Sequence, residues 1–375
     1  MNKIKLSEIC NINAGGTPAR NKKEYWDNGN IPWCKISDFS GKYILNVEES
    51  ITEEGLNNSS AKLFKKGTIL YTIFATIGEV AILNIESTTN QAIAGIEIKN
   101  DDVELEYLYY FLKSLKYKML NKSRGVAQNN INLSILRDTE IYLPDKNIQK
   151  EIAEKLDSIE KIICKKSEQL QELTNLVKSQ FVEMFGNSNN KEKIKSLNNY
   201  FSRGKSPNYV ESSKIGVINQ ACIYWDCFKM ENIKYQDELR ISSSFEKIIR
   251  KNDILITSTG TGTLGRCNVY SDEDNRYIAD GHVSILRLKE EIINPTYFKY
   301  YFMQDKVQKK LYSECVNGST NQIELSKDKF LNFDVSVPDI EKQNRFADFV
   351  KQIDKQKFVL YKTIEYLEII MYNIT

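Results

Sequence analysis

The sequence contains few of the residues on which most catalytic and metal sites depend. It has one histidine, His282, among 375 residues. Zinc sites of the His/Cys type and His-based catalytic triads are therefore nearly excluded. The seven cysteines are scattered, odd in number and without a C-x-x-C pair. This pattern favours reduced core thiols over a disulfide framework.

Long apolar runs and an excess of one charge are also missing. No stretch approaches the roughly 20 apolar residues that cross a bilayer. The alternating start, Met1 to Leu6, lacks the apolar core of a signal peptide. We therefore expect a cytoplasmic protein with no membrane partner. The net charge of +2, from 52 basic and 50 acidic residues, leaves DNA binding open, because an acidic face can offset a basic one.

Nucleotide and methyl-transfer motifs are incomplete. Residues Gly260 to Gly265 fit G-x-G-x-x-G after a predicted strand at 254–257, but 266–270 reads as a second strand instead of the helix that a dinucleotide site needs. We predict a hairpin turn there. No Walker A lysine pattern occurs, and the six isolated prolines exclude the Asn/Asp-Pro-Pro-aromatic loop of methyltransferases. The sequence predicts no catalytic residue, no metal site and no cofactor of its own.

A long helix with a heptad pattern occurs twice, the first copy from about Asn147 to Phe185 and the second at the end of the chain. Apolar residues alternate steps of three and four, and adding 194 to the first seam gives the second. Lys166, Gln180 and Lys357 interrupt the pattern as polar residues. Such seams predict an antiparallel helix pair. The predicted interface consists of Ile152, Leu156, Ile159, Ile163, Leu170, Leu173, Val177, Val350, Ile353, Leu360, Ile364 and Leu367.

The alternative is that each amphipathic helix packs on its own globular core. Ordinary globular helices average about three turns, so the length of these helices favours the pair. Both helices follow the same start signal, Pro144-Asp145 with Gln149, and Pro338-Asp339 with Gln343. Proline is tolerated just before a helix, and aspartate caps the amides of the first turn.

The rest of the chain also repeats. Residues 65–72 resemble 250–257, residues 131–134 resemble 323–326, and a helix at 104–120 has a partner near 295–311. A β-hairpin is expected over 67–83 around Gly78, strands at 92–98 and 139–143, and the start of a strand at 33–36. The predicted fold is α+β, with globular domains at 1–146 and 187–338, each followed by a long helix at 147–186 and 339–375.

Polar loops rich in Arg, Lys, Asn and Gln lie at matching places in the two halves. These side chains grip phosphates and read base edges in DNA, although they are also ordinary loop residues. Trp26 and Trp33 beside Lys35 suit base stacking, but burial is the more common fate of tryptophan. The candidates in these loops are Arg124, Gln128, Asn129, Arg203, Lys205, Asn219, Gln220, Arg266, Asn317 and Asn321.

Several short segments, in their order along the chain, resemble the specificity subunit of type I restriction-modification systems. The resemblance rests on Gly15-Gly16-Thr17-Pro18 with Tyr25-Trp26 and Ile31-Pro32-Trp33, on Thr76-Ile77-Gly78, on Leu143-Pro144 with Gln149 and Ile152, and on Arg203-Gly204-Lys205-Ser206-Pro207 with Ile218-Asn219-Gln220. It covers nearly the whole chain and adds Thr17, Arg20 and Lys35 to the candidate DNA-binding residues. The family often has Glu before the helix-start glutamine, whereas Ile148 and Lys342 stand here, so these helix starts are expected to touch partners differently.

The resemblance implies a division of labour. Two target-recognition domains each read one half of a split double-stranded DNA sequence. The paired helices set the gap and dock two methyltransferase (M) subunits, which carry S-adenosylmethionine and methylate adenine, and restriction (R) subunits are a further partner. Two alternatives stay open: a recognition component of another methylase or nuclease, and a structural coiled-coil adaptor without DNA affinity. The adaptor hypothesis is disfavoured by the basic residues in the predicted loops, which are Arg124, Arg203, Lys205 and Arg266.

Overall fold

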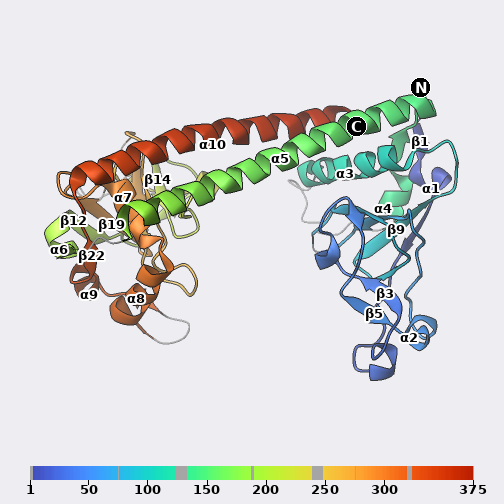
Figure 1. Ribbon diagram of the computed structural model, residues 1–375, viewed down its shortest axis with the longest axis horizontal. Helices are drawn as coiled ribbons and strands as arrows, with labels where there is room; N and C mark the ends of the chain where they lie inside the picture. The colour runs from blue at the N-terminus through green and yellow to red at the C-terminus, as the bar shows by residue number, and fades with distance from the viewer. Residues whose placement is uncertain are drawn as a thin grey trace. The chain divides into compact units, whose positions relative to one another are not determined.

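The computed structural model describes residues 3–74, 76–122, 133–186, 190–238, 248–274, 276–318 and 323–374 (Figure 1). The chain forms two compact units. The first unit consists of Met1–Glu168 with Leu360–Thr375, and the second consists of Gln169–Val359. Each unit combines mixed sheets, short helices and part of the two long helices, so the predicted α+β class with two repeated domains is confirmed.

The first unit is built on a sheet in the strand order β2-β9-β6-β7-β4. Its strands are β2 (Cys10–Ala14), β9 (Ile93–Ile98), β6 (Ile69–Thr72), β7 (Val80–Leu83) and β4 (Tyr43–Ile44). A smaller sheet has the order β5-β3-β8, with β5 (Glu49–Ile51), β3 (Ile31–Cys34) and β8 (Thr88–Thr89), and β1 (Lys3–Lys5) pairs with β10 (Glu140–Tyr142). The helices are α1 (Leu6–Ile9), η1 (Lys23–Tyr25), η2 (Ile36–Asp38), α2 (Glu53–Asn57), α3 (Leu105–Lys122) and α4 (Leu133–Asp138).

The core of the first unit lies between the large sheet and α3. Leu108 and Leu112 of α3 are fully buried in one cluster with Ile69, Tyr71 and Ile96 of the sheet. The opposite face of the sheet has its own cluster, so β6 and β7 are buried on both faces. This explains why their sequences read as continuous apolar runs. The expected hairpin is confirmed, because β6 and β7 pair antiparallel.

The second unit repeats this plan with a sheet in the order β12-β19-β16-β17. Its strands are β12 (Asn198–Arg203), β19 (Val283–Leu288), β16 (Ile254–Thr257) and β17 (Cys267–Val269). A second sheet has the order β13-β15-β14-β18, with β13 (Tyr209–Val210), β15 (Lys234–Gln236), β14 (Ile215–Ile218) and β18 (Tyr277–Ala279). β11 (Lys191–Lys193) pairs with β22 (Asp334–Ser336), and β20 (Val316–Asn317) pairs with β21 (Glu324–Leu325). The shorter helices are α6 (Ile194–Leu197), η3 (Met230–Asn232), α7 (Pro295–Phe302), α8 (Asp305–Cys315) and α9 (Lys327–Leu331).

The G-x-G-x-x-G segment lies in a turn and not before a helix. β16 and β17 pair antiparallel on either side of it, which confirms the predicted hairpin. Gly265 has a φ of +84° and its counterpart Gly78 a φ of +87°, so both turns end on a left-handed residue for which glycine is suited. The helix that a dinucleotide site would need therefore does not follow these glycines.

The two long helices are α5 (Lys146–Phe185) and α10 (Ile340–Ile374), drawn in green and red in Figure 1. The Asp145 carboxylate accepts the Asn147 amide at 2.9 Å, and the Asp339 carboxylate accepts the Glu341 amide at 2.8 Å. Both aspartates therefore cap their helices as predicted.

The helices pair antiparallel, as the packing inside each unit shows. In the second unit, Phe181 and Phe185 near the end of α5 pack on Phe346 near the start of α10. In the first unit, Ile152 near the start of α5 and Met371 near the end of α10 pack on the same core.

The side chains of the predicted seam are buried or half-buried, whereas most residues beside them are exposed. The fully buried members are Leu156, Val177, Val350 and Ile353. The half-buried members are Ile152, Ile159, Ile163, Leu170, Leu173, Leu360, Ile364 and Leu367, together with the seam lysines Lys166 and Lys357.

Two sequence predictions were wrong in detail. The single helix expected near 295–311 is two helices, because Gln304 adopts an extended conformation between α7 and α8. The Gln308 amide caps the freed carbonyl of Phe302 at 2.7 Å. The strand expected to start at Trp33 instead ends at Cys34, because the Asp38 carboxylate accepts the Lys35 amide at 2.7 Å and closes a 3-10 turn.

The cysteines are free thiols, and five of them are buried as expected. Cys164 and Cys227 are exposed, which corrects the expectation of a core position for these two. Cys164 follows the seam residue Ile163 on α5 and so points away from the helix pair. Among the helices of the described ranges, none is long and apolar enough to span a membrane.

Candidate nucleic-acid interface

Four segments of the second unit meet at one edge of its large sheet. Arg203 ends β12, Thr259 follows β16, His282 precedes β19, and Glu324 lies in β21. The Arg203 guanidinium donates through Nε to the Gly281 carbonyl and through NH1 to the Glu324 carboxylate at 2.9 Å. Thr259 and Glu324 form a backbone bridge, so residues far apart in the sequence are fixed side by side.

The polar side chains of this edge remain open to solvent. Thr259 Oγ1 and His282 Nδ1 lie 2.8 Å apart in a hydrogen bond. His282, Arg203 and Glu324 are all exposed, and Lys205 is exposed beside them in the loop after β12. This edge thus presents donors, an acceptor and positive charge together, which suits contact with a polar, charged surface such as DNA.

The β16–β17 turn packs on the loop after β14 through Arg266. Its guanidinium lies 4.8 Å from the centre of the Tyr224 ring, and NH2 donates to the Gln220 carbonyl at 3.4 Å. In the part of the chain that the structure describes, Arg266 Nε and Gln220 Oε1 are buried without a hydrogen-bond partner. Buried polar atoms are normally paired, so these two mark a place that is suited to a further polar contact.

Two predicted residues of the second unit use their side chains within the fold. Asn219 is buried, donates to the Asn232 carbonyl at 2.9 Å and accepts the Ala221 amide at 2.8 Å. It therefore shapes the loop that carries Gln220. Asn317 accepts the Lys329 ammonium at 2.8 Å and lies opposite Glu324 in the β20–β21 pair.

The matching edge of the first unit carries Thr17. Its hydroxyl donates to the Gln91 side chain, which joins the loop after β2 to the turn before β9. A side chain at Gly15 would lie 2.0 Å from Thr89 Oγ1, and one at Gly204 would lie 2.1 Å from the Ala279 carbonyl. The same close approach therefore demands glycine at the same place in both units.

Arg20 and Lys35 share one carboxylate. Arg20 lies 3.6 Å from the centre of the Trp26 ring and pairs with Glu49, and Lys35 pairs with Glu49 at 2.8 Å. The hydrogen bond from Lys35 is the main cause that lowers the pKa of Glu49 below its usual value, and the hydrogen bond from Arg20 is the second. Trp33 is 3% exposed, so burial and not stacking on a base is its role.

Four of the predicted residues lie outside the described residues: Arg124, Gln128, Asn129 and Asn321. Within the described ranges, no three His, Cys, Asp or Glu side chains gather so as to hold a metal ion.

The sequence identified Gln149 and Gln343 as part of a helix-start signal, but not the hydrogen bonds that they make to partners far away in the chain. Gln149 accepts the Glu104 amide at 2.9 Å and donates to the carbonyls of Asp102 and Pro144, each at 2.8 Å. Gln343 makes the same three kinds of bond to Asn294, Ile292 and Pro338. Both glutamines lie five residues after a proline, a spacing that identifies them in the sequence. Glu324 and His282 were missed as members of the interface, because neither forms a local motif.

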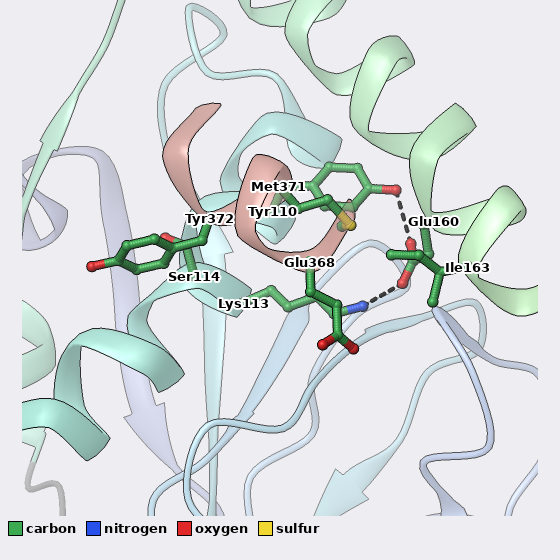
Figure 2. Close-up of a pocket in the computed structure, with 8 residues that line it drawn as sticks. All are labelled: Tyr110, Lys113, Ser114, Glu160, Ile163, Glu368, Met371 and Tyr372. Carbon is green, nitrogen blue, oxygen red and sulfur yellow. Dashed lines mark hydrogen bonds and ion pairs between the residues drawn. The ribbon is translucent and has the colours of Figure 1, made fainter. Parts of the chain in front are cut away.

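In the first unit, residues of α3, α5 and α10 line a small cavity of about 120 Å³. Figure 2 shows Tyr110 and Lys113 of α3 directed at Glu160 of α5, with Glu368 and Tyr372 of α10 nearby. Tyr110 donates to Glu160 at 2.9 Å, and Lys113 forms an ion pair with it. These contacts fix the globular part of the unit on its helices.

The fold defines a class: a protein with two copies of one α+β domain, each followed by a long helix. The family model "Type I restriction modification DNA specificity domain" matches residues 1–175 and 187–367. The chain therefore belongs to this family.

Named relatives agree with this assignment. The specificity subunit of the type I restriction enzyme MjaIX from Methanocaldococcus jannaschii is 35% identical over 186 residues, 48% of this chain and 43% of that protein. The EcoR124I/EcoR124II specificity subunit of Escherichia coli is 30% identical over 41% of this chain and 40% of that protein. These matches span less than half the length of either relative.

Two solved structures share the fold along the whole chain. The type I restriction-modification S subunit from M. genitalium aligns with a TM-score of 0.54 at 16% identity, covering 100% of this chain and 94% of that one. A chain from a study of complex assembly and conformational transition of the type I R-M system aligns with a TM-score of 0.60 at 15% identity, covering 100% and 96%.

Proposed function

We propose that this chain is the DNA sequence-specificity subunit of a type I restriction-modification complex. Each globular domain reads one half of a split double-stranded DNA target, and the α5–α10 pair sets the gap between the halves. The observation that carries the proposal is the double match to the specificity-domain family, one match for each copy of the repeated fold.

The edge of the second unit supports the DNA-binding part of the proposal. Arg203, Lys205 and Arg266 supply positive charge next to the hydrogen-bonding groups of Gln220 and His282. Contacts to phosphate position a protein on DNA, whereas contacts to base edges give sequence preference. This edge offers side chains for both.

The proposed partners are two methyltransferase (M) subunits, with restriction (R) subunits as a further component. In this proposal the chain is not an enzyme. S-adenosylmethionine is bound by the M subunits, which methylate adenine, and this chain has no cofactor of its own. The named relatives are specificity subunits of restriction enzymes, which favours this division of labour.

A base-resolution map of adenine methylation in the host, with the gene intact and deleted, tests the proposal. We expect deletion to remove methylation at one split motif with a gap of fixed length. Loss of an unsplit motif would favour a recognition component of another methylase. No change in the map, together with no salt-dependent DNA binding by the purified complex, would favour the structural adaptor.

A further inference from the structure

The second unit has a charged pair, Arg203 and Glu324, at its sheet edge, and the matched positions of the first unit hold the uncharged residues Ala14 and Asn132. The two units share their framework: Gly15 donates to the Ile93 carbonyl at 3.0 Å, and Gly204 donates to the Val283 carbonyl at 2.9 Å. This match places Arg203 where the first unit has Ala14, and His282 where it has Ala92. Glu324 matches Asn132 in the sequence repeat, and Asn132 lies outside the described residues.

Two domains that read different half-sites must differ where they touch bases. Framework residues such as Gly15 and Gly204 repeat, because both folds need them. Arg203 and Glu324 differ from their counterparts, although they lie at the same edge of the same framework. The positions that change between the copies are therefore the candidates for sequence preference.

We infer that Arg203 and Glu324 together read one G·C base pair in the half-site of the second domain. This inference rests on the proposed DNA-recognition function. In the major groove guanine presents the acceptors O6 and N7, which an arginine matches, and cytosine presents an N4 donor, which a carboxylate accepts. A guanidinium and a carboxylate held side by side thus complement the two bases of one pair.

The geometry keeps both groups in place without a bound partner. Arg203 NH1 lies 2.9 Å from Glu324, and Nε is held by the Gly281 carbonyl. The Glu324 backbone is fixed between Thr259 and Asn317. Their side chains are 39% and 54% exposed, so the outer part of each is open to a ligand. Preorganised side chains lose less conformational entropy on binding.

The carboxylate argues against a simple phosphate anchor at Arg203. A negative charge 2.9 Å from the guanidinium repels a phosphate that approaches the same group. Lys205 is exposed two residues further along, and no ion pair of its side chain is recorded within the described ranges. In this inference Lys205 contacts a phosphate, and the Arg203–Glu324 pair contacts the bases.

The test compares the Arg203→Ala, Glu324→Ala and Lys205→Ala variants in the full chain, assembled with its methyltransferase partners. The wild-type methylation map first defines the split motif. Binding of each assembled complex is then measured on duplexes in which every half-site position is changed in turn. We expect Arg203→Ala and Glu324→Ala to lose roughly 5- to 150-fold discrimination at one and the same G·C position. Lys205→Ala should weaken binding to all sequences alike.

Several outcomes would overturn the inference: no G·C pair in that half-site, changed preference at two different positions, or a uniform loss of affinity in the Arg203 and Glu324 variants. A wild-type complex that yields no split motif would instead reject the proposed function, so the two failures are distinguishable. Arg203→Lys and Glu324→Gln keep the size of the side chains. If the alanine variants fold poorly, these two variants replace them in the test. We expect them to lose discrimination at the same G·C position, by a smaller factor.

Discussion

Phe181 of α5 and Phe346 of α10 meet edge to face, with ring centroids 5.3 Å apart and ring planes at 78°. Phe346 is fully buried and also contacts Phe185 and Tyr300. Edge-to-face pairs add to the free energy of burial, because the positive edge of one ring faces the negative face of the other. The start of α10 is thus held by an aromatic cluster in the second unit.

Replacing Phe346 by alanine removes the centre of this cluster. We expect Phe346→Ala to lower the free energy of unfolding of the second unit by about 3–5 kcal/mol, since it opens a cavity in the core. Urea unfolding followed by Trp225 fluorescence measures it, in a chain whose other two tryptophans, Trp26 and Trp33, are replaced by phenylalanine. Phe358→Ala on the same helix is the control: that side chain is 63% exposed, and its loss should cost less than about 0.5 kcal/mol. Equal effects would contradict the packing argument.

A buried ion pair in the second unit links β19 to Asp253, the residue before β16. Arg287 donates to both carboxylate oxygens of Asp253, each at 2.7 Å, and Asp253 is fully buried. Asp253→Ala leaves the Arg287 guanidinium without its partner, so we expect a loss of about 3–5 kcal/mol in unfolding free energy. Asp272→Ala, at an exposed aspartate, should be nearly neutral. A loss below about 1 kcal/mol at Asp253 would indicate that Arg287 turns to solvent.

The first unit should lose stability in acid through Asp157. Its hydrogen bond with Lys42 is the main cause that lowers the pKa of Asp157 from 3.8 to about 2. A carboxylate with a lowered pKa in the folded state stabilises the protein above its unfolded pKa, and this contribution disappears as the pH falls from about 4 to 2. Because the group is partly exposed, we expect about 1 kcal/mol. Plots of unfolding free energy against pH for the wild type and Asp157→Asn should converge at pH 2. A constant difference between the two plots would exclude this role of Asp157.

The helix-start glutamines should matter equally in both units. Gln149→Ala removes three hydrogen bonds and leaves the Glu104 amide without its acceptor, so we expect a loss of about 2–3 kcal/mol. Gln343→Ala should have the same effect on the second unit. Gln171→Ala, at an exposed glutamine of α5, is the matched control. A loss of unfolding free energy in only one of the two variants would show that the two glutamines do not stabilise their units equally.

The length of the helix pair should set the gap in the DNA target. Matched insertions of seven residues in α5 and α10 preserve the seam and add about 10.5 Å of helix. This length corresponds to about three base pairs of DNA. We expect the methylation map to show the same half-sites with a longer gap. An insertion in α5 alone should disturb assembly, because it shifts the seam. Changed half-sites with an unchanged gap would contradict the prediction.

The long-range architecture could be predicted because it is periodic. A heptad seam of Leu156, Val177, Val350 and their neighbours specifies a helix pair through spacing alone. The β16–β17 hairpin could also be predicted, because a strand and not a helix follows its glycines. The break at Gln304 could not, since it depends on a side chain, Gln308, that caps a carbonyl six residues earlier.

The candidate interface was predictable in part. Loop composition pointed to Arg203 and Gln220, but Glu324 is 121 residues from Arg203 in the chain and meets it through strand pairing. Composition also suggested that Asn219 faces a ligand, whereas its amide is bonded to two backbone groups inside the fold. Which polar loop residues point outward depends on tertiary contacts that periodicity does not report.

The first unit contains both early and late parts of the chain. Residues from Leu360 onward complete its core beside α3, whereas the second unit is one continuous stretch, 169–359. During synthesis the whole segment of the second unit therefore emerges before the first unit can receive its last helical turns. A premature stop near Leu360 would therefore spare the second unit, all of whose residues precede it, and remove part of the first unit, most of whose residues come much earlier in the chain.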